Sequence, residues 1–234
     1  GLKGNNMSTL AIITARSKSK RIPKKNIREF CGKPIMSYSI EAALKSDVFD
    51  EVMVSTDSEE IAEIARSYGA SVPFMRSEKT AGDFATTRDV LMEVLNEYEK
   101  CGEKFDDMTC IYPTAPFVTA KKLRDAVALF KETKSSLLIP VVQFSYPPQR
   151  AYIIRNGMLQ FKWEEFRYTR SQDLEPFFHE AGQFYCYNIA DYLTADGAIK
   201  ENIIPFILPE SEVQDIDTEE DWKMAELKFS MMKR

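Results

Sequence analysis

Strand-like and helix-like segments alternate along the first 142 residues of this 234-residue chain, and this alternation constrains the fold more than any other feature. Thr9–Thr14 is a short run of apolar and β-branched residues that lacks the polar alternation of a half-buried strand. Such a run is typical of a strand covered on both faces. After it, apolar residues recur at helical spacing from Pro34, the expected first helical residue. The strand-like pattern and the helix-like pattern then alternate again along the chain. The sequence therefore predicts a doubly wound α/β domain with a mostly parallel sheet.

Turn and cap signals bound the expected elements. Asp57 opens a segment similar to a capping box, and the helix that follows is expected to end at Gly69. Thr119 is the expected cap of a later helix, and a last helix is expected from about Thr218. The expected strands cover residues 9–14, 51–56, 72–75, 108–112, 137–142, 183–188 and 203–208.

The alternation breaks over residues 143–180, which are rich in proline and aromatic side chains. Asn156 and Gly157 lie between two apolar runs and predict a β-hairpin. We expect a small β-rich insertion here, and not a second core. The remaining divisions are 1–8, expected to be disordered or tag-like, 9–142 as the α/β core, and 181–234 as the return to that core.

Charge and hydropathy exclude several classes of protein. The net charge of −5 argues against a protein that binds nucleic acid through bulk electrostatics. The longest apolar run, 137–142, is far shorter than the roughly 20 residues of a membrane span. The first six residues contain no apolar signal region, which favours a cytoplasmic protein. The four cysteines are scattered and suggest neither a zinc site nor a disulfide framework.

A basic segment follows the first expected strand. Between Arg16 and Arg28 there are seven basic residues and no acidic one. In an open α/β sheet this first loop is a common phosphate site, and clustered guanidinium, ammonium and hydroxyl donors suit a triphosphate. The loop lacks the glycine patterns of Rossmann and P-loop proteins. A solvated basic loop without a ligand is the alternative.

An acidic segment lies near the other end of the chain, where residues 210–221 contain seven acids and no base. Asp215 and Asp217, two positions apart on an extended segment, project to the same side and can share one divalent cation. The alternative is that Asp217 or Thr218 caps the last helix and Asp215 is exposed. A cation on this pair would contact a nucleotide's phosphates from the side opposite the basic loop.

Several motifs together resemble the CMP-sialate synthetases, the cytidylyltransferases of nine-carbon acidic sugars. Residues 15–26 follow the pattern A-R-x-x-S-K-x-x-x-x-K-N. Residues 54–57, 112–116 and 215–218 match further family motifs, although relatives often have glycine where this chain has Ser17 and Lys18, and proline at Thr14. The motifs that resemble the pseudaminic acid branch of the family are 83–87, 144–147, 169–176 and 179–185.

The resemblance implies a nucleotidyltransferase-type Rossmann-like fold and the transfer of CMP from CTP to the anomeric hydroxyl of pseudaminic acid, with release of pyrophosphate, for cell-surface glycan or flagellin glycosylation. The same reaction on sialic, legionaminic or 3-deoxy-octulosonic acid is an alternative, and a catalytically silent CTP-binding protein is another. The resemblance also implies Mg²⁺ as cofactor, with Mn²⁺ as a possible substitute. It implies a homodimer whose 143–180 arm completes the partner's sugar pocket, with no nucleic-acid or membrane partner.

The resemblance further implies roles for individual residues. Those with catalytic roles are Arg16, Lys20, Asp215 and Asp217, of which Asp215 and Asp217 bind the metal. The nucleotide-binding residues are Ala15, Arg16, Ser19, Lys20, Lys25, Asn26, Arg76 and Thr87. The sugar-binding residues are Tyr112, Arg170, Gln172, Asp173, His179, Gln183 and Tyr185.

Some of these side chains have simpler interpretations. Arg170 suits the sugar carboxylate because its guanidinium is a forked donor, but it can equally form a surface ion pair with Asp173 or Glu175. His179 can be an exposed or internally bonded histidine. Tyr112 and Tyr185, at strand ends, can be core aromatics. These alternatives remain open at the level of sequence.

Overall fold

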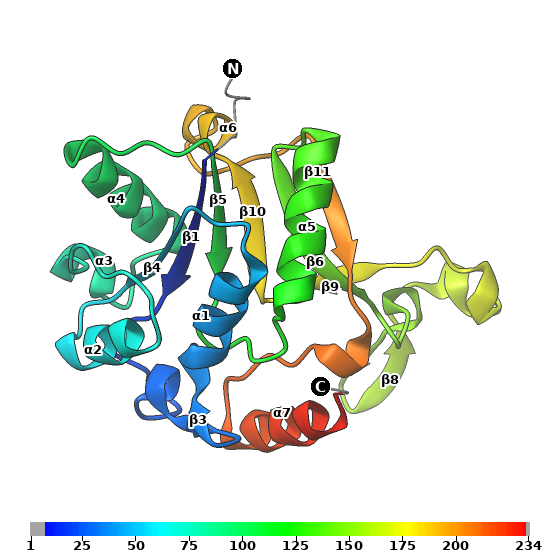
Figure 1. Cartoon of the computed structure of the whole chain (residues 1–234). Coiled ribbons are helices and arrows are strands. Elements are labelled where there is room, and N and C mark those ends of the chain that lie inside the picture. Colours follow the sequence, from blue (N-terminus) through cyan, green and yellow to red (C-terminus); the bar gives the residue numbers. More distant parts are fainter. Residues whose placement is uncertain (1–7, 233–234) are drawn as a thin grey trace.

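A seven-stranded sheet forms the centre of the chain in the computed structural model, which describes residues 8–232 (Figure 1). The strand order is β11-β6-β10-β5-β1-β4, and β9 pairs with β6 outside this path. β10 runs antiparallel to β5 and β6, and β9 antiparallel to β6, whereas the other pairs are parallel. The strands are β1 (Thr9–Thr14), β4 (Glu51–Ser55), β5 (Asp107–Ile111), β6 (Leu137–Gln143), β9 (Phe178–Glu180), β10 (Phe184–Asn188) and β11 (Ile203–Ile207).

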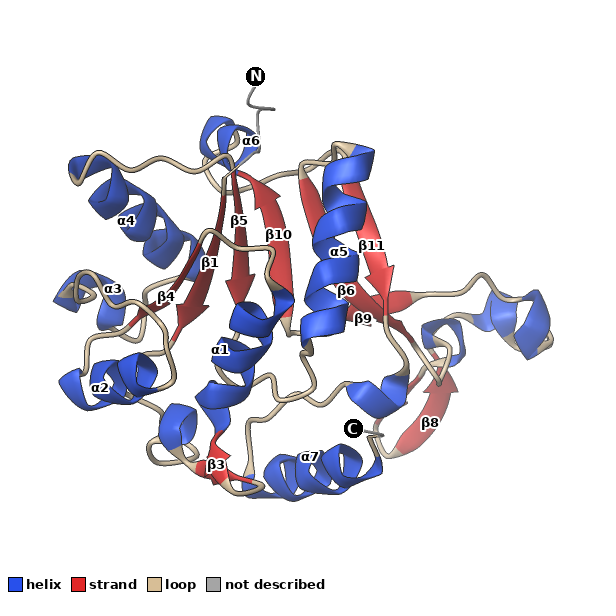
Figure 2. Cartoon of the chain, viewed as in Figure 1, coloured by secondary structure: helices blue, strands red, loops and turns tan. Residues whose placement is uncertain are grey.

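Helices cover both faces of this sheet, which confirms the predicted doubly wound α/β architecture (Figure 2). Ala11 and Ile13 of β1 face the helices α1, α2 and α5, while Leu10 and Ile12 face α4 and α6. All four side chains are fully buried, which explains why β1 shows no polar alternation. The helices are α1 (Ile35–Ser46), α2 (Glu59–Ser67), α3 (Glu78–Ala81), α4 (Thr87–Lys100), α5 (Ala120–Thr133), α6 (Ile189–Thr194) and α7 (Glu219–Met231).

The predicted caps of α5 and α7 are present, whereas α2 (Glu59–Ser67) is capped by Ser58 and not by a box that Asp57 opens. Thr119 accepts a hydrogen bond from the backbone N–H of Lys122 at the start of α5. Thr218 caps α7 in a reciprocal capping box with Asp221. Pro34, expected as the first helical residue, instead immediately precedes α1. The first turns of α5 and α7 are therefore each fixed by a threonine side chain.

One predicted strand is wrong. Residues 72–75 form no strand, and Ser71 makes only an isolated bridge to Met53. Pro73 has no amide hydrogen to donate to a ladder, and the chain leaves the sheet here. The predicted segment 1–8 lies, apart from Ser8, outside the described residues.

The predicted hairpin in the insertion is present between β7 (Tyr152–Arg155) and β8 (Met158–Phe161). Asn156 and Gly157 both have positive φ, 51° and 75°, as a two-residue hairpin turn requires. A second small hairpin joins β2 (Glu29–Phe30) to β3 (Lys33–Pro34). Short 3-10 helices cover Lys25–Ile27, Pro148–Arg150, Glu164–Phe166, Ser171–Asp173 and Glu210–Glu212.

A separate apolar cluster, which lies below the sheet in Figure 1, joins the region after β1 to the last helix. The cluster joins Ile22 and Phe30 of the first loop region to Trp222 and Phe229 of α7. The rings of Phe30 and Trp222 are 5.5 Å apart and meet edge to face. The α7 helix thus packs against the loop that follows β1.

Among residues 8–232, no helix combines the length and the apolar character that crossing a membrane requires.

The order of the strands places a crevice at the carboxyl end of β1. From β1 the chain crosses to β4 on one side and then returns to β5 on the other side. In open α/β sheets, ligands bind where the direction of such connections reverses. The loop after β1 and the residues after β5 therefore border the expected ligand site.

Candidate active site

A cavity of about 490 Å³ opens at this crevice. Its walls come from the loop after β1, from the segment between Arg76 and Val90, from the residues after β5, and from Asp217 near the other end of the chain. Ala15, which the sequence also predicted to bind the nucleotide, is fully buried beside the cavity. Its N–H donates to the carbonyl of Ser55 at 2.9 Å. The other predicted nucleotide residues all line the cavity: Arg16, Ser19, Lys20, Lys25, Asn26, Arg76 and Thr87.

Basic side chains of the segment 16–28 and an acidic side chain of the segment 210–221 lie together in this cavity. Lys20 and Asp217 both line it. The Lys25 Nζ atom lies 3.9 Å from Asp217 Oδ1 and donates a 2.8 Å hydrogen bond to the carbonyl of Ile216. The convergence predicted from the basic and acidic segments is therefore present in the fold.

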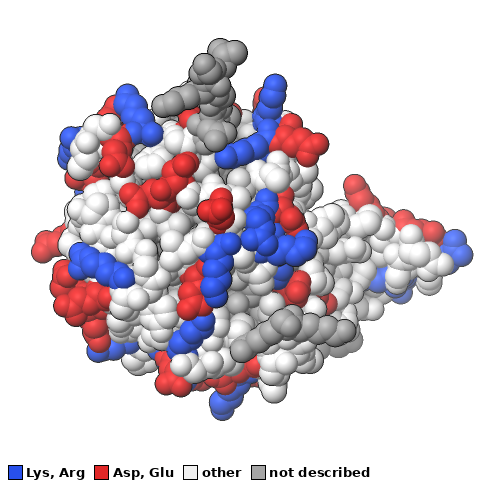
Figure 3. Space-filling view, viewed as in Figure 1, with Lys and Arg blue, Asp and Glu red and all other residues white. Residues whose placement is uncertain are grey.

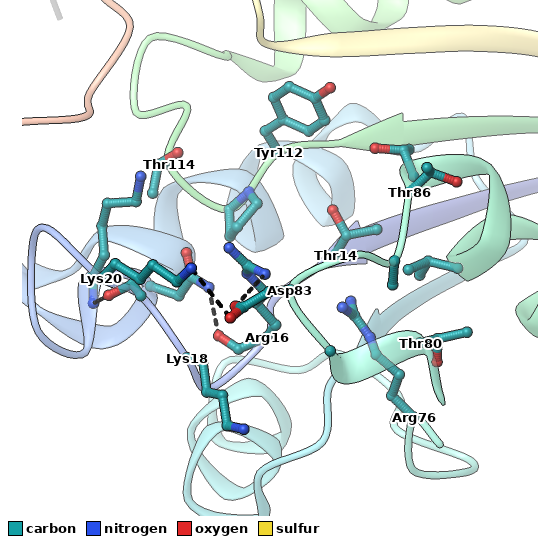
Figure 4. Close-up of a pocket in the computed structure, with 18 of the residues that line it drawn as sticks. Thr14, Arg16, Lys18, Lys20, Arg76, Thr80, Asp83, Thr86, Tyr112 and Thr114 are labelled. Carbon is teal, nitrogen blue, oxygen red and sulfur yellow. Dashed lines mark hydrogen bonds and ion pairs between the residues drawn. The ribbon is translucent and has the colours of Figure 1, made fainter. Parts of the chain in front are cut away.

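Asp83 lies among the cations of the cavity (Figure 4). Its carboxylate is 3.2 Å from Lys20 Nζ and 3.7 Å from Arg16 Nη1. Figure 4 shows both cationic side chains pointing toward it. A phosphate group entering the cavity would therefore compete with a carboxylate for the same two donors. In the sequence, Asp83 stands within a family-like motif, and no pattern there assigned it a role of its own.

Asp57 anchors the basic loop to the end of β4. Its two carboxylate oxygens accept the Ser17 N–H at 2.7 Å and the Ser17 hydroxyl at 2.5 Å. Burial alone would raise the pKa of Asp57, but these bonds and the charge of Arg76 outweigh it and hold the pKa below 3.8. Ser17, which stands where relatives often have glycine, thus supplies a second bond that fixes the loop.

Other loop residues hold the loop's own backbone. Asn26 donates from Nδ2 to the Arg16 carbonyl at 2.9 Å, and the Ser19 hydroxyl donates to the carbonyl of Ile22. Arg76 is 8% exposed and donates to the hydroxyl and the carbonyl of Ser55, at 3.1 and 2.9 Å. Burial lowers the pKa of Arg76 against the opposing charge of Asp57. The cationic wall is therefore held in place before any ligand binds.

The paired carboxylates present hard oxygen donors of the kind that Mg²⁺ prefers. Burial and the neighbouring charge of Asp217 raise the pKa of Asp215. In the described part of the chain, no three His, Cys, Asp or Glu side chains form a complete metal cage. The pair fits a cation that takes its other ligands from phosphate and water.

A second cavity, of about 480 Å³, lies on the other side of Tyr112, which lines both cavities. Asp215 lines this second cavity, whereas Asp217 lines the first, so the acidic segment also borders both. The other side chains around the second cavity include His179, Glu180, Tyr185, Glu210, Gln214 and Lys228.

The predicted sugar residues divide into two groups. Tyr112, His179 and Tyr185 line the second cavity, and Gln183 is buried near it, where its Nε2 donates to the Glu212 carbonyl at 2.8 Å. The other three, Arg170, Gln172 and Asp173, lie on the exposed arm and line neither cavity. There Arg170 forms the surface ion pair with Asp173, at 2.7 Å. In the sequence, Asp57 and Glu180 stand within family-like motifs and Lys228 stands in none, and no pattern there assigned any of the three a role in the site.

A doubly wound sheet with a cationic loop and paired carboxylates at its switch point defines a nucleotide-binding enzyme of the nucleotidyltransferase class. The chain belongs to the cytidylyltransferase family, whose sequence profile matches residues 10–192.

Comparison with known proteins agrees with this assignment. The chain is 39% identical over 226 residues to a pseudaminic acid cytidylyltransferase of Campylobacter jejuni, covering 96% of this chain and 97% of that protein. It is 36% identical over 228 residues to the CMP-N,N'-diacetyllegionaminic acid synthase of Legionella pneumophila, covering 94% and 95%. The solved structure of CMP:2-keto-3-deoxy-manno-octonic acid synthetase complexed with CTP shares the fold, with a TM-score of 0.71, 16% identity, and coverage of 95% and 98%.

Proposed function

We propose that this protein transfers CMP from CTP to the anomeric hydroxyl of pseudaminic acid and releases pyrophosphate. The observation that carries the proposal is the cavity in which Arg16 and Lys20 from one chain end meet Asp217 from the other. The full-length similarity to a protein named for this activity supports the choice of sugar. Because the reaction consumes CTP, we place it in the cytoplasm.

The basic loop would bind the triphosphate. Arg16, Ser19, Lys20 and Lys25 surround the space for the phosphates, and their charges would stabilise the negative charge that builds up on the leaving pyrophosphate. Phosphoryl transfer requires mainly positioning and charge stabilisation from a protein. The remaining cavity residues, Asn26, Arg76 and Thr87, would hold the cytidine.

Asp215 and Asp217 would hold Mg²⁺, for which Mn²⁺ could substitute. The ion would supply positive charge at the reacting phosphate. The carboxylates lie where the two cavities adjoin, and the phosphate of one substrate must meet the hydroxyl of the other there. The acidic segment would thus orient both substrates toward the reacting bond.

The second cavity would hold the sugar, and the 143–180 arm would form a homodimer. The arm exposes apolar residues, among them Ile154, which is 74% exposed, and Met158, which is 67% exposed. Figure 3 shows that much of its surface is uncharged in this view. Arg170 lines neither cavity of its own chain. A dimer would allow Arg170 to reach the sugar carboxylate in the partner's cavity.

The direct test measures pyrophosphate release with CTP, Mg²⁺ and each nonulosonic acid in turn. We expect release with pseudaminic acid, little release with the other sugars, and none in EDTA. Asp217→Ala should lower turnover at least about 100-fold without changing the melting temperature, whereas Asp125→Ala, an exposed change on α5, should be neutral. If the protein binds CTP but releases no pyrophosphate with any of the sugars, it is a catalytically silent CTP-binding protein.

The dimer has its own test. Ile154→Asp places a charge on the exposed hairpin without touching the core. We expect the variant to sediment as a monomer and to lose turnover of the sugar while it still binds CTP. A wild-type protein that sediments as a monomer at micromolar concentration would contradict the arm's role.

A further inference from the structure

Glu180 and Tyr185 form a hydrogen-bonded pair in the second cavity, beside the residue that borders both cavities. The Tyr185 hydroxyl donates to Glu180 Oε2 at 2.6 Å. The ring of Tyr185 lies 5.7 Å from that of Tyr112, which lines the first cavity as well. The pair therefore lies next to the place where a nucleotide phosphate and a second substrate could meet.

Rigid elements hold this pair. Glu180 ends β9 in register with Val141 of β6, and Tyr185 lies in β10 opposite Cys110 of β5. Tyr185 is 8% exposed, whereas Glu180 is an exposed residue that lines the cavity. Groups mounted on strands keep their geometry better than groups on loops. The carboxylate is thus fixed on one side and accessible on the other.

One oxygen of Glu180 is free to react. Oε2 is occupied by Tyr185, while Oε1 has no hydrogen-bond partner among residues 8–232. Burial and the bond to Glu180 raise the pKa of Tyr185 far above neutrality, so its phenol stays protonated and continues to donate. Tyr185 therefore orients the carboxylate and leaves Oε1 available as a proton acceptor.

The other charged side chains that line the cavity make contacts of their own. Glu210 accepts a hydrogen bond from the Ser145 hydroxyl at 3.1 Å. Lys228 donates to the carbonyl of Val213 at 2.8 Å, and the ring of His179 packs edge to face on Phe144. Asp215 belongs to the carboxylate pair described above. Of the three acids that line the cavity, Glu180 is the one carried by a strand and oriented by a buried tyrosine hydroxyl beside Tyr112.

We propose that Glu180 is the catalytic base of the transfer and that Tyr185 is its positioning residue; the inference rests on the proposed function. The attacking hydroxyl of the sugar gives its proton to Glu180 Oε1 as its oxygen forms a bond to the α-phosphorus. The bond from the α-phosphorus to the bridging oxygen breaks, and pyrophosphate leaves with the electron pair. The proton then passes from Glu180 to water, which restores the carboxylate.

The test compares Glu180→Gln with Glu132→Gln, a matched change of an exposed acid on α5 that lines neither cavity. Because a general base contributes about 10²–10⁴-fold, we expect kcat of Glu180→Gln to fall by that factor, with the KM for CTP and the melting temperature unchanged. Glu132→Gln should keep kcat within about 3-fold, as expected for a group that takes no part in binding or proton transfer. Tyr185→Phe should lower kcat less than Glu180→Gln does.

A chemical rescue separates catalysis from structure. Glu180→Ala should recover at least about 10-fold in kcat when formate is added, because a small carboxylate can replace the missing base. Glu180→Gln with a kcat near that of the wild type, or Glu180→Ala without rescue, would overturn the role of Glu180 alone. A wild-type enzyme that releases no pyrophosphate with any nonulosonic acid would instead overturn the proposed function.

Discussion

Asp107 is a buried carboxylate at the start of β5, at the end of the sheet opposite the active-site cavity. It is 1% exposed, and neither of its carboxylate oxygens has a hydrogen-bond partner in the described part of the chain. The hydroxyl of Thr9, its register partner on β1, is likewise unsatisfied among those residues. Burial raises the pKa of Asp107 from 3.8 to about 6, and the charge of Lys131 offsets only part of that effect. The ionised form is therefore costly to the fold.

The sign of the pH dependence follows from proton binding. Between pH 3.8 and about 6 the folded chain keeps the Asp107 proton and the unfolded chain releases it, so stability falls as the pH rises through this range. Above about pH 7, the burial of the ionised Asp107 carboxylate lowers the free energy of unfolding by about 3 kcal/mol, at 1.36 kcal/mol per pKa unit. Because an amide is never ionised, Asp107→Asn should raise the free energy of unfolding at pH 8 by about 1–3 kcal/mol. The gain can be smaller than the full cost because the buried amide also loses its hydrogen bonds to water.

The assay is urea unfolding of the wild type and Asp107→Asn at pH 4, 6 and 8 and at fixed protein concentration. The gain should be near zero at pH 4 and largest at pH 8, with CTP binding unchanged. Asp125→Asn, in an exposed pair with Lys121, should change stability by no more than about 0.5 kcal/mol. A gain that does not depend on pH, or a loss at pH 8, would refute the reasoning.

Three further changes probe the cavity and its support. Asp83→Asn should lower the Kd for CTP about 2–5-fold by titration calorimetry, since exposed ion pairs such as the one with Lys20 contribute about 0.2–1 kcal/mol each; weaker binding would show that Asp83 does not compete with phosphate. Thr218→Ala should cost about 1 kcal/mol in urea unfolding, through loss of the cap of α7. Trp222→Ala should cost about 3–5 kcal/mol by the same assay, and a cost under 1 kcal/mol would mean that α7 is not needed for stability.

Local patterns in the sequence predicted local structure well. The Asn156-Gly157 turn needs two positive φ values, and the caps at Thr119 and Thr218 need only a hydroxyl and a nearby N–H. The buried run of β1 was equally clear, because its burial is a property of the fold class. These features depend on a few neighbouring residues, and so they can be derived without the fold.

Features that depend on distant residues could not be derived in this way. The direction of β10 follows that of β9, which ends at Glu180 just before it and also pairs antiparallel with β6, and nothing within the five residues of β10 shows that direction. The 72–75 segment has strand-like composition, yet its proline and the exit of the chain prevent pairing. Asp83 and Glu180 are single acids whose importance lies only in what the fold places beside them. The roles assigned to the site residues remain predictions.

The basic loop poses an electrostatic problem that α7 helps to solve. Seven like charges in thirteen residues repel one another, so an ordered loop needs opposing charges and apolar packing. Arg28 pairs with Glu219 at 2.6 Å and stacks over Trp222 at 4.5 Å, while Lys25 donates to the carbonyl of Ile216. The segment that supplies the paired carboxylates therefore also orders the cations they face. Because one packing contact fixes both, displacement of α7 would disorder the phosphate site and separate the carboxylates from it in a single step.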